Sequence, residues 1–242
     1  MIFPVKVPYT VGPDIVKYEG PAFNADPDPA YLLEKKKELE LNERHICGSI
    51  GNDYLHQLNT FCGFDANTTL PEICVGLEED VAILKDGHLH AIGFCFPSGF
   101  YPAQKLGLSF FDMHLPVGDG ETLRRSSEKV SALISKQDAM FRRYVWTLTS
   151  LPSLSQLPSY TKPTPQSIHD LYFRTETQTT VGIGGDICLF FVKVEMHPLQ
   201  QVWDDSAKRE SIIESINSMS EEVLNYKNLA YIKSIIYSIS IV

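Results

Sequence analysis

The segment VAILKDGHLHAIGFCF, residues 81–96, constrains the fold more than any other part of the chain. It contains two apolar, partly alternating runs separated by Asp86-Gly87, a dipeptide that favours the two-residue turn of a β-hairpin. A second pair of strand-like runs, 171–180 and 186–196, is separated by the glycine-rich VGIGG, so we expect a second antiparallel hairpin. Because hairpins and helical segments occur without repeated βαβ spacing, the sequence predicts an α+β fold.

Amphipathic segments around the hairpins predict helices. The first begins at Asp28-Pro29 and continues through AYLLEKKKELELNERH, whose lysine run is expected to form its solvated face. A shorter helix is expected at 53–62, and the patterns of 121–137 and 207–227 indicate amphipathic helices. The last segment, 229–242, is apolar and fits either a helix or a strand.

Proline-rich and polar stretches predict the irregular parts of the chain. Residues 1–30 contain repeated prolines, each of which removes a backbone donor, so we expect an extended arm on the surface. The polar FDANTTLPE at 64–72 indicates a loop, and 151–166 indicates a long surface loop, either a lid or a domain linker. Because the chain beyond 166 is too short for a separate core, we expect one domain over 1–242, with 207–242 as a C-terminal helical region.

The composition excludes several classes of partner. A formal net charge of −9, with a pI near 5.2, provides no global positive field for a nucleic acid or an anionic membrane surface. The five cysteines are scattered without a C-x-x-C pair, which favours free thiols in a reduced compartment over a disulfide framework or a zinc knuckle. The first residues have no secretory pattern, and no apolar run approaches the ~20 residues of a membrane span. We therefore expect a soluble, cytoplasmic protein.

Short motifs for metal, phosphate or nucleophile chemistry are weak. His88 and His90 are expected on one strand face, where two imidazoles are able to bind a metal, but exposed histidines beside a turn are the commoner outcome. Gly182, Gly184 and Gly185 precede a strand rather than a helix, which favours a turn over a phosphate cradle. The sequence contains no G-x-S-x-G, H-E-x-x-H or iron–sulfur cysteine motif.

The run LYFRTETQ, residues 171–178, alternates along the first strand of the second hairpin. One face is expected to carry Tyr172, Arg174, Glu176 and Gln178, and the other Phe173, Thr175 and Thr177. An arginine held by a glutamate is able to clamp a carboxylate or a propionate through charge-assisted hydrogen bonds. The alternative, a solvated strand face, fits the pattern equally well.

The segment FPSGFYPAQKLGLSFFDMHLPVG, residues 96–118, places His114 between apolar residues and a proline turn. A histidine in this setting is able to reach a buried metal or cofactor, and a buried structural histidine is the alternative. Together with other segments it resembles the alpha subunit of haem-dependent oxidative N-demethylases, a family that includes dimethylamine monooxygenase-type proteins. The resemblance runs in order over about 76–199, through LEEDVAIL, FPSGFYPAQKLG, MHLPVG, RYVW and FRTETQT.

The resemblance implies a fold, a cofactor and partners. The fold would be a PAS-like α+β domain, an antiparallel sheet with flanking helices, that binds one haem b. A separate flavin and iron–sulfur reductase would deliver electrons for the activation of molecular oxygen, and the reaction would be oxidative N-dealkylation, or a related hydroxylation, of a small amine. The alternatives are a haem- or small-ligand-binding sensor without turnover, and a paralogue that has lost haem.

His114 receives a role from this resemblance. It matches the histidine of the family's I-H-x-P-V-P-like segment, while Lys105 and Gly107 match its K-x-G. The match implies that His114 is the axial ligand of the haem iron. Its apolar neighbours would exclude water from the porphyrin; these are Phe110, Phe111, Met113 and Leu115.

Polar residues of the second hairpin and the RYVW segment also receive roles. The family's R-x-E-x-Q-T segment is matched by Arg174, Glu176, Gln178 and Thr179. The implied catalytic residues are Glu176 and Gln178, with Glu176 placed to hold the substrate amine. The implied partners of the haem propionates are Lys105, Arg143 and Arg174, and Trp146 completes the cofactor-binding set.

The chain departs from the family pattern at several positions. Thr177 stands where the family usually has arginine, Phe100 where it has tryptophan, and Val145 where it has asparagine. The turn that follows Q-T in the family is replaced by TVGIGG. The resemblance therefore supports the fold more strongly than the substrate.

Overall fold

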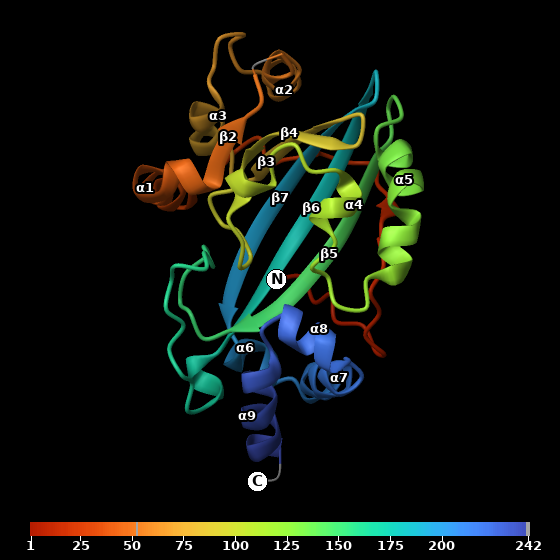
Figure 1. The fold of residues 1–242 in the computed structure, drawn as a ribbon. Coiled ribbons are helices and arrows are strands. Elements are labelled where there is room, and N and C mark those ends of the chain that lie inside the picture. The colour runs from red at the N-terminus through yellow and green to blue at the C-terminus, as the bar shows by residue number, and fades with distance from the viewer. Residues whose placement is uncertain (52, 241–242) are drawn as a thin grey trace.

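An antiparallel sheet forms the centre of the computed structural model, which describes residues 1–51 and 53–240, with side chains up to 236 (Figure 1). The strand order is β1-β5-β6-β7-β3-β4-β2, and every neighbouring pair is antiparallel. The strands are β1 (Val16–Lys17), β2 (Cys47–Ser49), β3 (Asp80–Lys85), β4 (His88–Gly93), β5 (Met140–Thr149), β6 (Tyr172–Gly184) and β7 (Ile187–Pro198). With the helices that flank the sheet, this arrangement confirms the predicted α+β fold.

The first hairpin has the turn that its sequence predicts. β3 and β4 are joined by Asp86 and Gly87, whose φ angles are 50° and 73°. A two-residue turn with positive φ at both positions matches the right-handed twist of the strands it connects, and Asp-Gly adopts it at little cost. This hairpin is therefore confirmed.

The second hairpin is also present, but its turn includes only the last residue of the predicted VGIGG. β6 continues to Gly184 through a register shift between Gly182 and Gly184, and the chain reverses at Gly185 and Asp186, with φ angles of 57° and 56°. Glycine is required at position 182 because an added Cβ would lie 2.0 Å from the carbonyl oxygen of Lys136. The predicted glycine-rich turn is thus present but shorter, because Gly182 and Gly184 form a bulge inside the strand and only Gly185 of this run lies in the turn.

Helices surround the sheet. They are α1 (Pro29–Ile46), α2 (Leu55–Cys62), α3 (Leu70–Gly76), α4 (Phe110–Met113), α5 (Glu121–Ile134), α6 (Gln200–Trp203), α7 (Ser206–Asn217), α8 (Glu221–Tyr226) and α9 (Ala230–Ser240), with short 3₁₀ turns η1 (Pro102–Lys105) and η2 (Ile168–Asp170). The predicted start of α1 is confirmed, since the Asp28 side chain accepts a hydrogen bond from the Ala30 amide (2.9 Å) and Pro29 occupies the first turn.

Local capping explains two errors in the predicted helices. The loop predicted at 64–72 ends early, because Thr69 and Glu72 form a capping box that starts α3. The single helix predicted at 207–227 is two helices, since the Ser220 hydroxyl accepts from the Val223 amide and begins α8 anew. The undecided segment from 229 is helix α9 up to Ser240, with 241–242 outside the described residues. β5 was not predicted as a strand.

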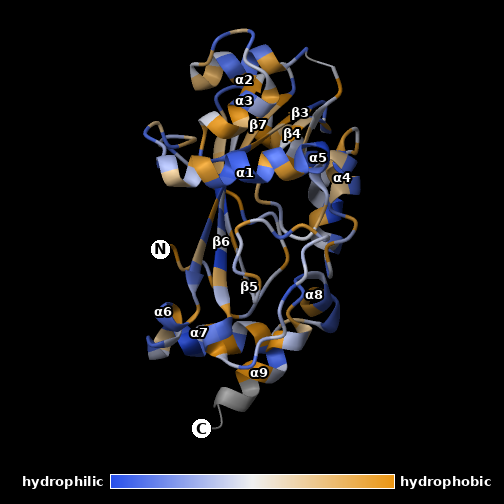
Figure 2. Cartoon of the chain, turned by 90° about the vertical axis from the view of Figure 1, so that its left-hand side faces the viewer, coloured by the Kyte–Doolittle hydropathy of each residue, from blue (hydrophilic) through white to orange (hydrophobic). Residues whose placement is uncertain are grey.

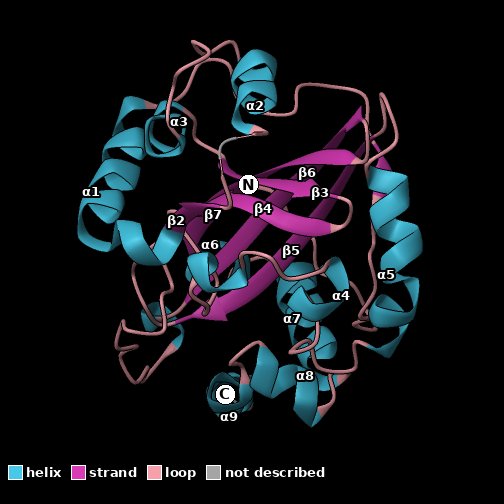
Figure 3. Cartoon of the chain, turned by 45° about the horizontal axis from the view of Figure 1, so that its top comes forward, coloured by secondary structure: helices cyan, strands magenta, loops and turns pink. Residues whose placement is uncertain are grey.

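The two faces of the sheet are covered by different helices (Figure 3). One face packs against α1, α2 and α3 through Leu39, Leu58 and Ile73, which meet Ile83 and Leu189 of the sheet. The other face packs against α5 through Val130 and Ile134, which meet Leu84 and Cys188. The alternation of 83 with 84 and of 188 with 189 shows that these two cores lie on opposite faces.

A further apolar cluster closes the far end of β5 and β6 (Figure 2). Leu148 and Phe173 from the sheet are buried there against α6, α7, α8 and α9. Partly buried residues of the proline-rich arm pack against the same cluster; these are Phe3, Val5, Tyr9 and Val11. The arm, which has no helix and contributes only β1, is therefore part of the packing at this end.

The 151–166 segment contains neither helix nor strand. Its middle is nevertheless buried at Ser155, Gln156 and Leu157. The Tyr160 hydroxyl donates to the Glu38 carboxylate of α1 (2.9 Å), and the Thr149 hydroxyl bonds Gln156 (2.7 Å). These contacts fix the segment to the sheet and α1, which gives no support to a lid. No helix in the described part of the chain is long and apolar enough to cross a membrane.

Candidate functional site

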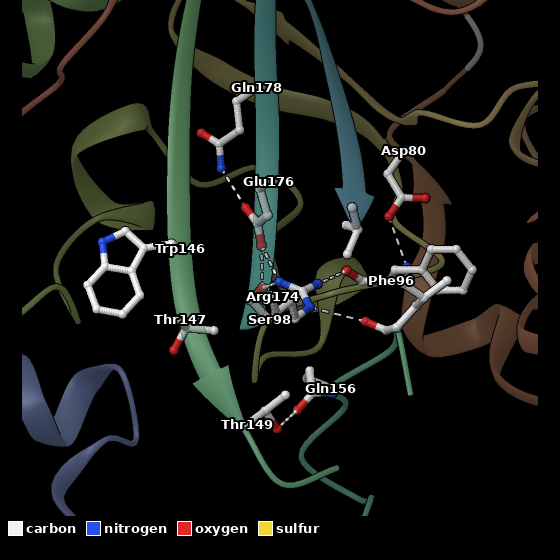
Figure 4. A network of polar contacts seen from close by, with 12 residues as sticks. Asp80, Phe96, Ser98, Trp146, Thr147, Thr149, Gln156, Arg174, Glu176 and Gln178 are labelled. Carbon is white, nitrogen blue, oxygen red and sulfur yellow. Dashed lines mark hydrogen bonds and ion pairs between the residues drawn. The ribbon is translucent and has the colours of Figure 1, made fainter. Parts of the chain in front are cut away.

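A polar network lies on the face of β6 that the alternation of LYFRTETQ predicts (Figure 4). The Arg174 Nη1 donates to Glu176 Oε1 (2.6 Å), and the Gln178 Nε2 donates to Glu176 Oε2 (2.7 Å). The Ser98 hydroxyl, from the segment after β4, also donates to Glu176 Oε1. We call Ser98, Arg174, Glu176 and Gln178 the Glu176 network. It brings together three residues that the sequence placed in one site.

Arg174 is held entirely by the protein. Its side chain is 1% exposed, and each guanidinium nitrogen donates a hydrogen bond: Nη2 to the carbonyl oxygen of Phe96 (2.7 Å), Nε to that of Leu154 (3.3 Å), and Nη1 within the Glu176 network. Because these hydrogen bonds fix its planar guanidinium, Arg174 holds the Glu176 carboxylate in position. The geometry therefore favours a positioning role over the binding of a haem propionate.

A buried ion pair fixes the segment that carries Ser98. Asp80 accepts hydrogen bonds from the amides of Cys95 and Phe96, both at 2.9 Å, and pairs with the Lys35 ammonium at 3.2 Å. The side chains of Lys35 and Asp80 are 0% and 1% exposed. The expectation that the whole lysine run of α1 is solvated is wrong for Lys35, which also donates to the carbonyl oxygens of 77–79. No local pattern in the sequence distinguishes it from its neighbours.

The Glu176 carboxyl group is ionised. Burial opposes its charge, but the Arg174 guanidinium and the hydrogen bonds from Ser98, Arg174 and Gln178 outweigh burial and hold its pKa below the usual value. Oε1 accepts two hydrogen bonds and Oε2 one, so Oε2 retains acceptor capacity. Glu176 is therefore able to accept a hydrogen bond from a cationic amine.

His114 directly follows α4, which Ser109 starts by accepting a hydrogen bond from the Asp112 amide (3.0 Å). The Nδ1 of His114 lies 2.6 Å from the carbonyl oxygen of Phe110. A carbonyl only accepts, so Nδ1 carries the proton and the neutral ring keeps a lone pair on Nε2. Burial lowers the pKa of His114; the Phe110 contact opposes this shift, and the charges of Arg143 and Lys105 add to it.

Arg143 and Lys105, whose charges act on His114, have few partners in the protein. Arg143 faces the same side of the sheet as the Glu176 network, because it pairs with Gln178 in the β5–β6 register. Its Nε is buried without a hydrogen-bond partner. Among the described residues, the Lys105 ammonium has neither a hydrogen bond nor an ion pair. Two cations and a free imidazole nitrogen thus occupy one region.

Comparison with protein families decides the membership of the chain. The model of the family described as haem-dependent oxidative N-demethylase, alpha subunit-like, matches residues 42–237. The chain belongs to this family. The match is wider than the predicted 76–199 and includes α7 and α8 together with most of α9. No curated protein matches the chain. Family membership implies a haem cofactor and suggests molecular oxygen and a redox partner.

The residues around His114 fit a haem-dependent family member. A neutral imidazole whose Nδ1–H is bound to a carbonyl is the form that ligates iron through Nε2. The uncommitted cations Arg143 and Lys105 suit carboxylate groups. Phe111 and Leu115 are 43% and 52% exposed, and such apolar surface beside a histidine suits the face of a porphyrin.

Trp146 lies apart from His114 in this haem-dependent N-demethylase-like chain. It pairs with Thr175 in the β5–β6 register and therefore points to the face opposite the Glu176 network. Its ring stacks on Phe173 (centroids 5.8 Å apart) and is 3% exposed in the cluster that includes Phe3. The structure thus gives Trp146 a packing role on the face of the sheet opposite Arg143 and Arg174.

Sequence reasoning missed the residues that α8 and the arm bring to the site. Lys227, directly after α8, donates to the carbonyl oxygen of Trp146 (2.6 Å) and lies 5.3 Å from the ring centroid of Tyr9. The charges of Glu176 and Arg143 act on both Lys227 and Tyr226. No local motif marks these residues, because only tertiary packing brings them to the sheet.

The short histidine and cysteine motifs of the sequence lie outside the Glu176 network. The Nδ1 of His88 contacts the carbonyl oxygen of Asp86 (2.9 Å), and the His90 ring packs edge-on against Tyr54. A register shift opposite His90 interrupts the strand face that the two histidines were predicted to share. Within 1–51 and 53–240, no group of three His, Cys, Asp or Glu side chains is arranged to hold a metal ion. All five cysteines are free thiols.

Proposed function

We propose that this protein is a haem-dependent monooxygenase that oxidises the carbon next to the nitrogen of an amine. The observation that carries the proposal is the His114 imidazole, whose Nδ1–H is bound to the Phe110 carbonyl and whose Nε2 is free to ligate iron. The cofactor would be haem b, which His114 would hold through Nε2, and Arg143 and Lys105 would pair with its propionates. Electrons come from a separate flavin and iron–sulfur reductase.

The chain's own residues bind and orient the substrate. The Glu176 carboxylate, ionised and fixed by Arg174 and Ser98, accepts a hydrogen bond from the substrate ammonium through Oε2. The Gln178 side-chain amide also donates a hydrogen bond to Oε2 and thereby orients the carboxylate. Phe110 and Met113, partly buried beside His114, exclude water.

The haem, when bound, would supply the activation of molecular oxygen. The overall reaction takes up one oxygen molecule, two electrons and two protons, hydroxylates the N-alkyl carbon and releases one water. The hydroxylated product then loses its aldehyde to give the dealkylated amine. The net charge of −9 suits docking of a reductase through a basic patch.

The sheet arrangement supports the single PAS-like domain implied by the family resemblance. β3 of the first hairpin pairs with β7 of the second, so one sheet unites strands from residue 16 to 198. The Glu176 network, Arg143 and the segment carrying His114 all lie on one face of this sheet. We therefore propose one domain over 1–242, with the arm and the C-terminal helices packed on its far end.

An absorption spectrum of protein expressed with ample haem precursor tests the axial ligand. We expect a Soret band in the wild type that is lost or shifted in His114→Ala, in both the oxidised and reduced forms. His88→Ala is the matched control, because His88 is exposed at a hairpin turn. An unchanged Soret band in His114→Ala would refute the assignment.

Turnover separates the monooxygenase from a sensor on the same fold. Oxygen consumption with stoichiometric aldehyde release, when an amine and reductant are supplied, is the expected result. Ligand-dependent spectra without product would show the sensor instead.

A further inference from the structure

Lys227 is a half-buried cation without an anionic partner. Its ammonium donates to the carbonyl oxygen of Trp146 (2.6 Å) and lies 5.3 Å and 5.6 Å from the ring centroids of Tyr9 and Trp146. In the described part of the chain it forms no ion pair. Burying a cation without a counter-charge costs free energy. A bound anion beside Lys227 would therefore be stabilised by the charge of the ammonium.

Lys227 belongs to the same electrostatic region as Glu176 and Arg143. Both of these charges act on Lys227, and both also act on Tyr226, its neighbour on α8. Contact between α8 and the segment after His114 closes this region, because an added Cβ at Gly118 would lie 2.6 Å from the backbone of Glu222. The Thr147 hydroxyl, which lies on the face of Arg174 in the β5–β6 register, donates to the carbonyl oxygen of Lys227 (3.4 Å). The end of α8 therefore lies on the Glu176 side of the sheet.

The charges of this region do not balance for a simple amine. Glu176 is already paired with Arg174 (2.6 Å), whereas neither Arg143 nor Lys227 forms an ion pair with any residue that the structure describes. Haem propionates would occupy Arg143 and Lys105 and leave Lys227 unmatched. A substrate ammonium at Glu176 adds another positive charge, which Lys227 would repel. A substrate that also carries a carboxylate removes this imbalance.

We propose that the substrate is a zwitterion, an N-alkylated amino acid, whose ammonium group donates to Glu176 and whose carboxylate is bound by Lys227. This inference rests on the proposed function, because it names the substrate class of the same site. Lys227 is then a specificity-determining residue: the ammonium that holds the Trp146 carbonyl has further N–H groups available for a carboxylate.

The titration of Lys227 agrees with this assignment. Burial lowers the pKa of Lys227 to about 8; the charge of Glu176 opposes this shift and that of Arg143 adds to it. A carboxylate bound to the ammonium would raise the pKa again, since an opposite charge favours the charged form.

Calorimetric titration of the haem-loaded protein with paired probes tests the inference. The probes are N,N-dimethylglycine and N,N-dimethyl-β-alanine, which differ in spacing, and their primary amides, which keep the amine and lack the carboxylate. We expect at least one acid to bind about tenfold more tightly than its amide, the size expected of one charge-assisted hydrogen bond. Lys227→Gln should reduce this preference to about twofold or less, and Lys227→Arg should keep most of it.

Lys129→Gln is the matched control, since Lys129 is exposed on α5 and should keep the full preference. Equal binding of every acid and its amide by the wild type, including no binding of either, overturns the inference and needs no variant. A preference that survives in folded Lys227→Gln also overturns it. An acid preference without aldehyde release from any probe supports the zwitterion site and contradicts the proposed turnover, so the two failures are distinguishable.

Discussion

Lys35 and Lys36 are neighbours on α1, yet only Lys35 is buried. The Lys35 side chain enters the protein to meet Asp80 (3.2 Å), whose other contacts hold the amides of Cys95 and Phe96. The Phe96 carbonyl oxygen in turn accepts from Arg174 (2.7 Å), which fixes Glu176 (Figure 4). A chain of buried polar contacts therefore connects α1 with the carboxylate of the site.

Replacing Lys35 with methionine should lower the free energy of unfolding by about 3–5 kcal/mol, because it leaves Asp80 as a buried charge without its partner. Lys36→Met, an exposed change of the same kind one residue along, should alter it by about 0.5 kcal/mol or less. Urea unfolding of both variants measures the difference. Equal stability of the two variants would contradict the buried ion pair.

Arg174 illustrates what the alternation of a strand sequence predicts for a single residue and what it does not. Alternation along LYFRTETQ correctly placed Arg174, Glu176 and Gln178 on one face. It could not show that the guanidinium also donates to Phe96, Leu154 and Ser98, which come from segments far along the chain. The partners of a long side chain depend on tertiary packing, whereas the face of a strand depends on period alone.

Among the elements, α8 contacts the segment that follows His114, although it has only six residues. It begins at Glu221, where Ser220 caps it, and ends beside Lys227. Its first turn lies against Gly118, in the segment that follows His114. This close approach of two backbones connects the histidine segment with the C-terminal helices, and a side chain at 118 would separate them.

Gly118→Ala should destabilise the protein by about 1–3 kcal/mol, since the new Cβ would lie 2.6 Å from the carbonyl carbon and oxygen of Glu222. Backbone atoms cannot move aside as a flexible side chain does. Gly12→Ala is the control, because the nearest atom to its Cβ would be 3.7 Å away. Thermal or urea unfolding gives both values, and no loss of stability in Gly118→Ala relative to Gly12→Ala would rule out the contact.

The helix α3 could have been predicted from the sequence. Thr69-Leu70-Pro71-Glu72 has the spacing of a capping box with proline in the first turn, and the structure shows both reciprocal hydrogen bonds. The polar composition of 64–72 instead suggested a loop. Capping signals of this kind are local, so the Thr-x-x-Glu spacing is enough to predict where this helix begins.

At the scale of the whole molecule, the arm and the C-terminal helices meet around the end of β5 and β6. The Phe3 ring stacks on Phe173 (centroids 5.7 Å apart), which stacks on Trp146 in turn. The arm therefore adds to the apolar cluster formed by α6, α7, α8 and α9. Residues at both ends of the sequence thus stabilise the strands that carry the site.

Phe3→Ala should lower the free energy of unfolding by about 1–3 kcal/mol, less than for a fully buried phenylalanine because Phe3 is partly exposed. Ile2→Ala, at a position 36% exposed, should have a much smaller effect. Chemical denaturation of the two variants makes the comparison. If Phe3→Ala is no more destabilising than Ile2→Ala, the arm does not pack on the cluster.

The sequence by itself determined the two hairpins, most of the helices, the polar face of β6 and the family resemblance, because period, capping and turn chemistry act between residues close in the chain. Only the tertiary structure decided that Lys35 is buried, that Arg174 is bound to Glu176, that Trp146 faces away from His114, and that Lys227 donates to the Trp146 carbonyl. Each of these depends on contacts between segments distant in sequence, which the packing of the sheet and helices alone brings together.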